Sequence, residues 1–380
     1  MSEPSFNKIR PYKNKEIQEA IPRIIADPQF KPLMNYLYPA ENHKSIQENL
    51  LKVKNVTEFQ QVLTLPAIEG IVNNTSDGLT SSGFENISKD KHYVFVANHR
   101  DITLDSSILG MLLFQHGIEP SQITWGNNLM VSQLIIDLGK CNQMITVFRD
   151  GTPKEILLNS QKLSAYIRKV VVDENKTVWI AQRKGRAKDG FDRTDMSILK
   201  MLSLSRTSDV KSGLIDLNIV PVTASYELEP CGGMKVKEIY QSQSENYVKD
   251  KDEDFKSILG GVTIPKGRIH FSIGKPINAD ILNVDDSLNK NELVEKVAQI
   301  IDKQIYQNYH LWPTNYLAYD LLEQTNRFSS YYDEKAKAHL DARLDMAFKA
   351  VEVDSDEIRK LFLTMYANPV YNKLKVEEND

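Results

Sequence analysis

The feature of this sequence that most constrains its fold is the alternation, over the middle of the chain, of short apolar runs with longer helical patterns. Runs rich in β-branched and aromatic residues predict strands, whereas apolar residues spaced three and four apart predict helices. Alternation of the two is typical of α/β proteins. We therefore expect a mostly parallel or mixed central sheet flanked by helices. The expected strands lie near residues 79–85, 93–97, 145–148, 177–182, 217–222 and 268–273, and the expected helices near 105–116, 129–138, 153–172 and 194–208.

The segments on either side of this middle part have helical patterns. Near the N-terminus, Pro66 should kink or split an amphipathic helix, because proline cannot donate a backbone hydrogen bond. Near the C-terminus, we expect the last helix to end before Pro369. The chain is thus expected to comprise a helical N-terminal region over 1–78, an α/β domain over 79–284 and a helical C-terminal region over 285–380 that packs on the core.

Composition narrows the class of protein. The 380 residues carry a net charge of −4, which argues against a dedicated nucleic-acid partner. The two cysteines, Cys141 and Cys231, have no metal-ligand spacing, so neither a disulfide framework nor a metal site is expected. The N-terminus has no apolar signal segment, and no window reaches the ~18 consecutive apolar residues of a transmembrane helix. We expect a cytoplasmic protein that is at most peripheral on the inner face of the membrane.

The first stretch that indicates chemistry is Asn98–Asp105. It follows a predicted buried strand, Tyr93–Ala97, and precedes an apolar helix that begins near Asp105. A histidine at the end of a strand, with a carboxylate at the start of the next helix, can form a general base whose tautomer the carboxylate fixes. The alternative interpretation is a surface loop in which His99 is incidental and Asp105 only caps the helix.

The second stretch, Gln182–Gly190, follows a predicted strand and combines basic residues with glycines. Glycines let backbone amides approach an anion closely, and arginine offers a fork of donors that matches phosphate. Ligands of α/β proteins bind at the C-terminal ends of strands. A phosphate or carboxylate site is therefore expected here. The alternatives are an exposed basic turn and an RNA contact, although no aromatic platform accompanies the loop.

Two further stretches are weaker signals. Met144–Phe148 is a largely apolar run that is followed by Arg149. Taken alone, Arg149 could be an ordinary ion-pair partner. Ile219–Val222 is an apolar run that contains Pro221. A proline inside a strand suggests either the edge of a sheet or a wall near a ligand.

The order of these four stretches resembles the glycerolipid acyltransferase family, that is, the glycerol-3-phosphate and lysophosphatidate acyltransferases. The family's blocks are Asn-His-x4-Asp, a strand that ends in Phe-x-Arg, a Glu-Gly-x-Arg loop and an apolar strand with proline. Gly83–Ile87 looks like the lead-in to the first block, and Phe271–Ile277 looks like the closing strand. The resemblance covers roughly residues 80–300 and leaves the flanking helical parts uncovered.

This resemblance implies an O-acyltransferase that moves a fatty acyl group from a thioester to the hydroxyl of a glycerol-phosphate or lysophospholipid-like acceptor. His99 would abstract the hydroxyl proton, and Asp105 would orient the imidazole. Acyl-CoA or acyl-carrier protein would be the co-substrate, with no other cofactor, and a membrane surface would be a partner. The residues implied for binding the acceptor's anionic group are Arg100, Arg149, Arg183, Gly185, Arg186 and Lys188, while Pro221 would lie along the acyl chain.

The sequence departs from the family pattern at two points. Asp105 lies one residue later than the family's aspartate, and Asp101 is a rival partner for His99. The family's glutamate before the third block is absent, since Gln182, Arg183 and Lys184 occupy that region. The second departure keeps open an alternative function, a non-catalytic lipid- or acyl-carrier-binding protein on the same fold.

Overall fold

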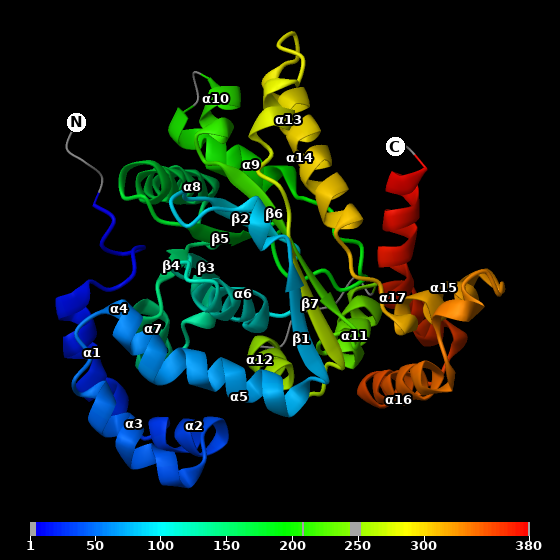
Figure 1. The fold of residues 1–380 in the computed structure, drawn as a ribbon, viewed down its shortest axis with the longest axis horizontal. Helices are drawn as coiled ribbons and strands as arrows, with labels where there is room; N and C mark the ends of the chain where they lie inside the picture. Colours follow the sequence, from blue (N-terminus) through cyan, green and yellow to red (C-terminus); the bar gives the residue numbers. More distant parts are fainter. Residues whose placement is uncertain (1–4, 207–208, 244–251, 379–380) are drawn as a thin grey trace.

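The computed structural model describes residues 5–206, 209–243 and 252–378. At its centre is a seven-stranded sheet with the strand order β1-β7-β6-β2-β5-β3-β4 (Figure 1). All neighbouring strands are parallel except β6 and β7, which are antiparallel. This confirms the α/β class and the mostly parallel sheet. The strands are β1 (Gly78–Ser82), β2 (Val94–Ala97), β3 (Gln122–Gly126), β4 (Met144–Val147), β5 (Val178–Ala181), β6 (Ile219–Tyr226) and β7 (Arg268–Ile273).

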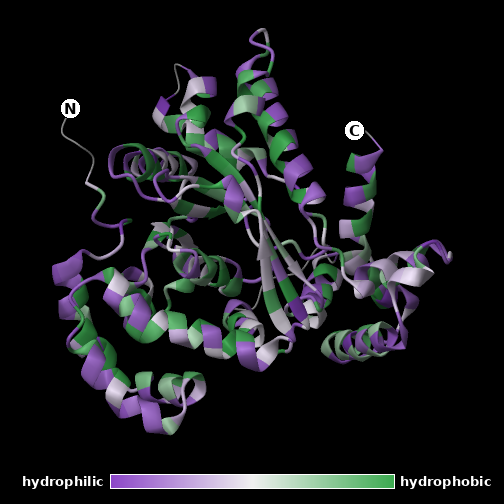
Figure 2. Cartoon of the chain, in the orientation of Figure 1, coloured by the Kyte–Doolittle hydropathy of each residue, from purple (hydrophilic) through white to green (hydrophobic). Residues whose placement is uncertain are grey.

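Helices surround this sheet (Figures 1 and 2). Those beside it bury apolar side chains against its two faces, whereas most of the N-terminal helices and the last three helices form apolar clusters of their own. The first five precede the sheet: α1 (Asn14–Ala26), α2 (Phe30–Leu37), α3 (His43–Leu50), α4 (Val56–Phe59) and α5 (Leu65–Thr75). Eight lie between or beside the strands: α6 (Leu104–Gln115), α7 (Gln133–Cys141), α8 (Pro153–Arg168), α9 (Met196–Ser203), α10 (Val210–Ile215), α11 (Gly232–Ser242), α12 (Glu253–Thr263) and α13 (Asn278–Leu282). The last four follow: α14 (Lys290–Gln307), α15 (Pro313–Glu323), α16 (Glu334–Val351) and α17 (Asp356–Glu377).

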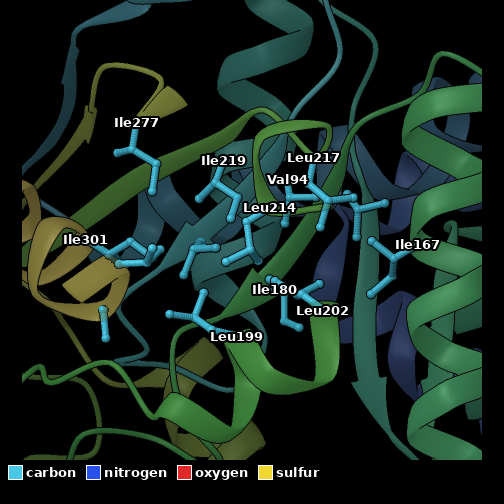
Figure 3. Packing of buried hydrophobic residues seen from close by; sticks show 14 of the residues in the cluster. Val94, Ile167, Ile180, Leu199, Leu202, Leu214, Leu217, Ile219, Ile277 and Ile301 are labelled. Carbon is cyan, nitrogen blue, oxygen red and sulfur yellow. The ribbon is translucent and has the colours of Figure 1, made fainter. Parts of the chain in front are cut away.

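The sheet is buried on both faces. In β2, Val94 and Val96 belong to one apolar cluster, while Phe95 and Ala97 belong to another on the opposite face. Successive side chains of a strand point to opposite faces, so a strand buried on both sides is apolar throughout. Helices α8, α9, α10 and α14 cover the first face (Figure 3), and α5 and α6 cover the second. This double cover fixes the strand ends from which the site is built.

The N-terminal helices lie at one side of the sheet and α15–α17 at the other (Figure 1). As the sequence predicts, the helix around Pro66 is interrupted: a π-helical turn, Gln60–Thr64, separates α4 from α5. Pro66 stands in the first turn of α5, which directly follows the π-helical residues. The N-terminal segment before α1 runs along the outer edge of the sheet, where the Thr146 amide donates to the Ile9 carbonyl over 2.9 Å.

The prediction that the last helix ends before Pro369 is wrong, because α17 continues to Glu377. Proline leaves the carbonyl four residues earlier without its helical donor. That carbonyl belongs to Met365, and Gly190 packs against it so closely that a Cβ at Gly190 would lie 2.1 Å from the oxygen. Gly190 has a φ of +74°. The loop after β5 thus packs on α17 at the carbonyl that the proline leaves without its helical donor.

Candidate active site

The site is built from the C-terminal ends of four adjacent parallel strands, β2, β5, β3 and β4. Strands β3 and β5 pair only at Gln122 with Val178 and at Ile123 with Trp179, and then separate. A pocket of about 370 Å³ opens at this separation, and residues of both strands line it. A crevice at the carboxyl ends of strands is the usual ligand position in such sheets.

His99 lies just beyond β2 and lines this pocket. Its Nδ1 is 3.0 Å from Asp105 Oδ2, and its side chain is 14% exposed whereas that of Asp105 is 1% exposed. Because an ionised carboxylate only accepts, the neutral ring carries its proton on Nδ1 and keeps a lone pair on Nε2. The Trp179 ring meets the imidazole edge-on, with 5.8 Å between the centroids. This geometry can present a general base to a ligand in the pocket.

Asp105 is fixed by three donors besides His99. The backbone amides of Arg100 and Asp101 donate to Oδ2 over 2.6 and 2.9 Å, and the Tyr226 hydroxyl donates to Oδ1 over 2.9 Å. The rival carboxylate has a different role, since Asp101 Oδ1 accepts from the amides of Thr103 and Leu104 at the start of α6. His99 therefore contacts Asp105 rather than Asp101, and the helix-capping interpretation applies to Asp101.

The loop after β5 brings basic side chains to the same pocket. It is tied to the histidine by the amide of Ala187, which donates to the His99 carbonyl over 2.7 Å. Gly185 adopts a φ of +75°, a conformation that favours glycine. Arg186 is buried and donates through Nη2 to Ser257 Oγ over 3.0 Å, while Nη1 has no partner among the described residues. The pocket is lined by Arg183, Lys184, Gly185, Arg186 and Lys188.

The acidic residues of the pocket compensate only part of this charge. Lys188 forms an ion pair with the buried Glu238. Arg149, which follows β4, also lines the pocket, and burial lowers the pKa of its guanidinium although Asp254 and Asp150 raise it. A cation whose burial outweighs its carboxylate neighbours is well placed to receive an anion.

Apolar side chains form the remainder of the lining. They come from both sides of the separated strands and from the helices that cover them. Such a lining suits a flexible hydrocarbon chain, because it removes apolar surface from water without offering polar partners. Among these side chains are Ile123, Trp125, Leu129, Val147, Phe148, Ile156, Leu163, Ile180, Ile198 and Met201.

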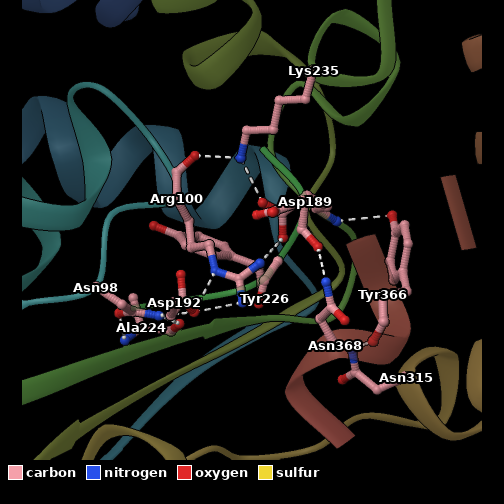
Figure 4. Close-up of polar contacts among 12 residues, drawn as sticks. Asn98, Arg100, Asp189, Asp192, Ala224, Tyr226, Lys235, Asn315, Tyr366 and Asn368 are labelled. Atoms are coloured by element: carbon pink, nitrogen blue, oxygen red, sulfur yellow. Dashed lines mark hydrogen bonds and ion pairs between the residues drawn. The ribbon is translucent and has the colours of Figure 1, made fainter. Parts of the chain in front are cut away.

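Arg100 was expected to bind substrate, and the structure places it elsewhere. Its guanidinium is buried behind the histidine, 2.7 Å from Asp192 Oδ2 and 3.1 Å from Glu229 Oε2 (Figure 4). Lys235 donates to the Arg100 carbonyl over 2.6 Å and pairs with Glu229. The Tyr309 hydroxyl donates to Asp192 over 2.7 Å. Arg100 does not line the pocket because two carboxylates hold it in the core.

Pro221 was expected at a sheet edge or along an acyl chain, but it is buried in β6, an interior strand, and does not line the pocket. Its carbonyl accepts from Gly274, just beyond the end of β7. The N–H and C=O of one residue point to the same side of a strand, so the missing N–H faces the place where β7 has ended. The proline therefore costs the sheet no strand-to-strand hydrogen bond.

Sequence reasoning missed Tyr226, which supports the His99–Asp105 pair through Asp105 Oδ1. Tyr226 lies at the end of β6, and the only sequence signal for it is its position after a predicted strand. Asn98 continues the pairing of β2 with β6 through its side chain, which accepts from the Ala224 amide over 2.7 Å and donates to its carbonyl over 3.1 Å. Gln182, one of the three residues in the region where the resemblance would place a glutamate, is fully buried and does not line the pocket; its side-chain Oε1 accepts from the Thr194 hydroxyl over 3.4 Å.

Over the described ranges, no helix is long and apolar enough to cross a bilayer. In the same part of the chain, no group of three or more His, Cys, Asp or Glu side chains is placed to hold a metal ion. Both cysteines are free and buried.

Comparison with solved structures finds a similarity to the crystal structure of the 1-acyl-sn-glycerophosphate (LPA) acyltransferase, PlsC, from Thermotoga maritima. The identity is 12% and the TM-score is 0.36, over 76% of this chain and 95% of that chain. No protein-family model matches the sequence, and no curated protein matches it. A similarity of this size assigns neither an activity nor a residue role.

Proposed function

We propose that the protein is an O-acyltransferase that moves a fatty acyl group from a thioester to the hydroxyl of a glycerol-phosphate or lysophospholipid-like acceptor. The observation that carries this proposal is the contact of His99 Nδ1 with Asp105 at the wall of a pocket that is both basic and apolar. A base, an anion site and an apolar wall in one crevice are what such a transfer needs. The order of the sequence blocks, from His99 to Pro221, supports the same assignment.

In the proposed reaction, His99 Nε2 takes the proton of the acceptor hydroxyl as its oxygen attacks the thioester carbonyl. The new C–O bond forms, the C–S bond breaks, and the leaving thiolate receives the proton from Nε2. Asp105 stabilises the ring while it carries both protons. A general base of this kind contributes roughly 10²- to 10⁴-fold in rate. No covalent acyl-protein intermediate is required.

The basic lining residues would bind the phosphate or other anionic group of the acceptor and so hold its hydroxyl near His99. Binding a remote group in this way lowers the barrier, because the acceptor loses its freedom of orientation before the reaction step rather than during it. Arg186 has a buried nitrogen without a partner in the described part of the chain, which suits a ligand oxygen. The acyl chain would lie against the apolar residues between the separated strands.

A membrane surface and an acyl thioester are the proposed partners. Exposed apolar side chains lie within two residues of pocket-lining ones at three places: Val131 near Leu129, Leu157 and Leu158 after Ile156, and Phe255 after Asp254. Apolar side chains beside a basic mouth suit a bilayer interface. Flotation with vesicles of anionic lipid tests this partner, and Leu157→Ser with Leu158→Ser should reduce the bound fraction severalfold; no reduction would contradict it.

The function is tested by turnover. The purified protein is assayed with acyl-CoA and with acyl-carrier protein, against glycerol 3-phosphate and lysophospholipids, and the products are identified by lipid mass spectrometry. His99→Ala should lower kcat by about 100-fold or more, since it removes the base. His92→Ala is the matched control, because it lies just before β2, at the opposite end of the strand from the base.

Two outcomes would overturn the proposal. If kcat falls less than tenfold in His99→Ala, while His92→Ala keeps the original kcat, His99 is not the base. Tight binding of acyl donor or lipid with no turnover across all acceptors would favour the non-catalytic lipid- or acyl-carrier-binding alternative.

A further inference from the structure

Asp105 is an unusually well-held carboxylate, and one of its donors comes from a distant strand. Tyr226 reaches it from the end of β6, 121 residues along the chain, and its hydroxyl lies 2.9 Å from Oδ1. The other oxygen, Oδ2, accepts from His99 and from the amides of Arg100 and Asp101. The two oxygens thus have separate partners. Tyr226 is the donor on the side of the carboxylate that faces away from the histidine.

Tyr226 is itself held rigidly. It is buried, pairs with Ile269 of β7 in the sheet register, and meets the Phe271 ring edge-on at 6.4 Å. Burial, together with the neighbouring Asp105, raises the pKa of its phenol well above the ordinary value, so the hydroxyl keeps its proton. It is a fixed donor across the pH range in which an imidazole titrates.

We propose that Tyr226 is a positioning residue for the His99–Asp105 pair, which rests on the function proposed above. Its hydroxyl anchors Oδ1 and takes up part of the carboxylate's charge, while Oδ2 stays on His99 Nδ1. As a consequence, Asp105 holds the His99 ring in one tautomer but accepts less strongly from Nδ1 than it would without the Tyr226 hydroxyl. Without the hydroxyl, more of the negative charge acts on the ring, because a hydrogen bond to the charged form of an acid stabilises that charge.

The other ionisable groups around the pair do not replace this donor. Asp101 faces the same region but accepts from the start of α6. Arg186 approaches from the loop after β5 and donates to Ser257. Its positive charge opposes the rise that burial causes in the pKa of Asp101. Glu229 lies beyond Tyr226 and is engaged by Arg100 and Lys235. Lys188 is paired with Glu238.

The direct test is spectroscopic and needs no turnover. The proton on His99 Nδ1 gives a low-field ¹H NMR signal when it is hydrogen-bonded to a carboxylate, and His99→Ala identifies the signal by its loss. Tyr226→Phe should move this signal further downfield, because Asp105 becomes a stronger acceptor. Site-specific 3-fluorotyrosine at Tyr226, whose hydroxyl is a stronger donor, should move it upfield. Opposite shifts from the two changes would support the proposal even if Tyr226→Phe were destabilised.

The kinetic test separates positioning from general stability. In Tyr226→Phe, kcat should fall about tenfold with KM within about twofold, and the acidic limb of the pH–rate profile should move up by about half a unit. Tyr166→Phe is the matched control: its buried hydroxyl donates to Gln122 Oε1 over 3.1 Å and does not touch the pair. It should leave both the NMR signal and the pH profile in place.

The outcomes are distinguishable from those of the function itself. If the NMR signal shifts as expected but no acceptor is acylated, Tyr226 positions the pair and the acyltransferase proposal fails. If the enzyme turns over but Tyr226→Phe changes neither the signal nor the acidic limb relative to Tyr166→Phe, the positioning role is overturned.

Discussion

His99 and Arg100 are adjacent in sequence, yet their side chains lie in opposite kinds of surroundings. His99 lines the basic pocket, whereas Arg100 turns into a buried cluster with Asp192, Glu229 and Lys235 (Figure 4). The buried cluster pairs its two cations with two carboxylates. The pocket, by contrast, is lined by five basic side chains and two acidic ones.

The difference shows how to separate structural from ligand-binding arginines. A buried cation whose charge is matched by carboxylates is stabilised by the protein itself and has nothing left to offer a ligand. A cation whose burial is not fully compensated needs an outside anion. On this criterion Arg100 belongs to the scaffold, and Arg149 and Arg186 belong to the proposed binding site.

The buried side of the comparison predicts the largest effect. Arg100→Met should lower the free energy of unfolding by about 3–5 kcal/mol, because it leaves the buried Asp192 without its cation and Glu229 with Lys235 alone. Urea denaturation followed by circular dichroism measures this. Arg183→Met, which removes the same group from the pocket, should change stability by less than about 0.5 kcal/mol. Equal losses of stability in the two variants would show that the buried cluster and the pocket do not differ in how far carboxylates balance their arginines.

The sequence predicted most of the sheet because its strands are short apolar runs between helical patterns. β3 was missed, since Gln122–Gly126 mixes polar and apolar residues and lacks a continuous apolar run. Its pairing with β4 and β5 depends on segments that surround it in space rather than in sequence. Pro369 was misjudged because α17 continues through it. Gly190, far away in the chain, packs against the carbonyl that the proline leaves without a helical donor, a contact that no local pattern reveals.

The site was predictable where its parts are local. His99 and Asp105 are six residues apart, and their contact follows from a strand end and a helix start. Arg100 was misjudged because its partners, Asp192 and Glu229, lie 92 and 129 residues away. Tyr226 was missed because nothing in its own neighbourhood shows that it ends beside Asp105. Long-range pairing therefore decides which charged residues face the pocket. The catalytic and binding roles themselves stay predictions.

The pocket side predicts an effect on affinity rather than on folding. Arg149→Met should weaken the binding of glycerol 3-phosphate about tenfold, because it removes a partly buried cation from the lining of the pocket. Lys188→Met is the matched comparison, and it should weaken binding less, since Glu238 already engages that lysine. Calorimetric titration of each variant with glycerol 3-phosphate, and with inorganic phosphate in parallel, measures both. A larger loss from Lys188→Met would reverse the assignment of the two cations.

The smallest expected effect concerns the negative charge of Asp302, which lies close to the buried cluster and has no cation of that cluster as its partner in the contacts given above. Asp302 of α14 accepts from the Thr194 amide over 2.8 Å, close to the Asp192 end of the cluster. Burial raises its pKa from 3.8 to about 6, and Asp192 contributes in the same direction. The folded state therefore keeps a proton between about pH 4 and pH 6 that the unfolded state releases, so the contribution of Asp302 to stability falls as the pH rises through that range.

Asp302→Asn should thus stabilise the protein at pH 7.5 by about 1 kcal/mol, because the amide stays neutral and its oxygen can still accept from Thr194. The gain should shrink as the pH falls towards 4, where the unfolded state also begins to bind this proton. Urea midpoints at pH 7.5, 6 and 4.5 measure the trend, with the exposed Asp341→Asn as control. A gain that does not depend on pH, or one that the control shares, would mean that the cluster carries no excess negative charge at Asp302.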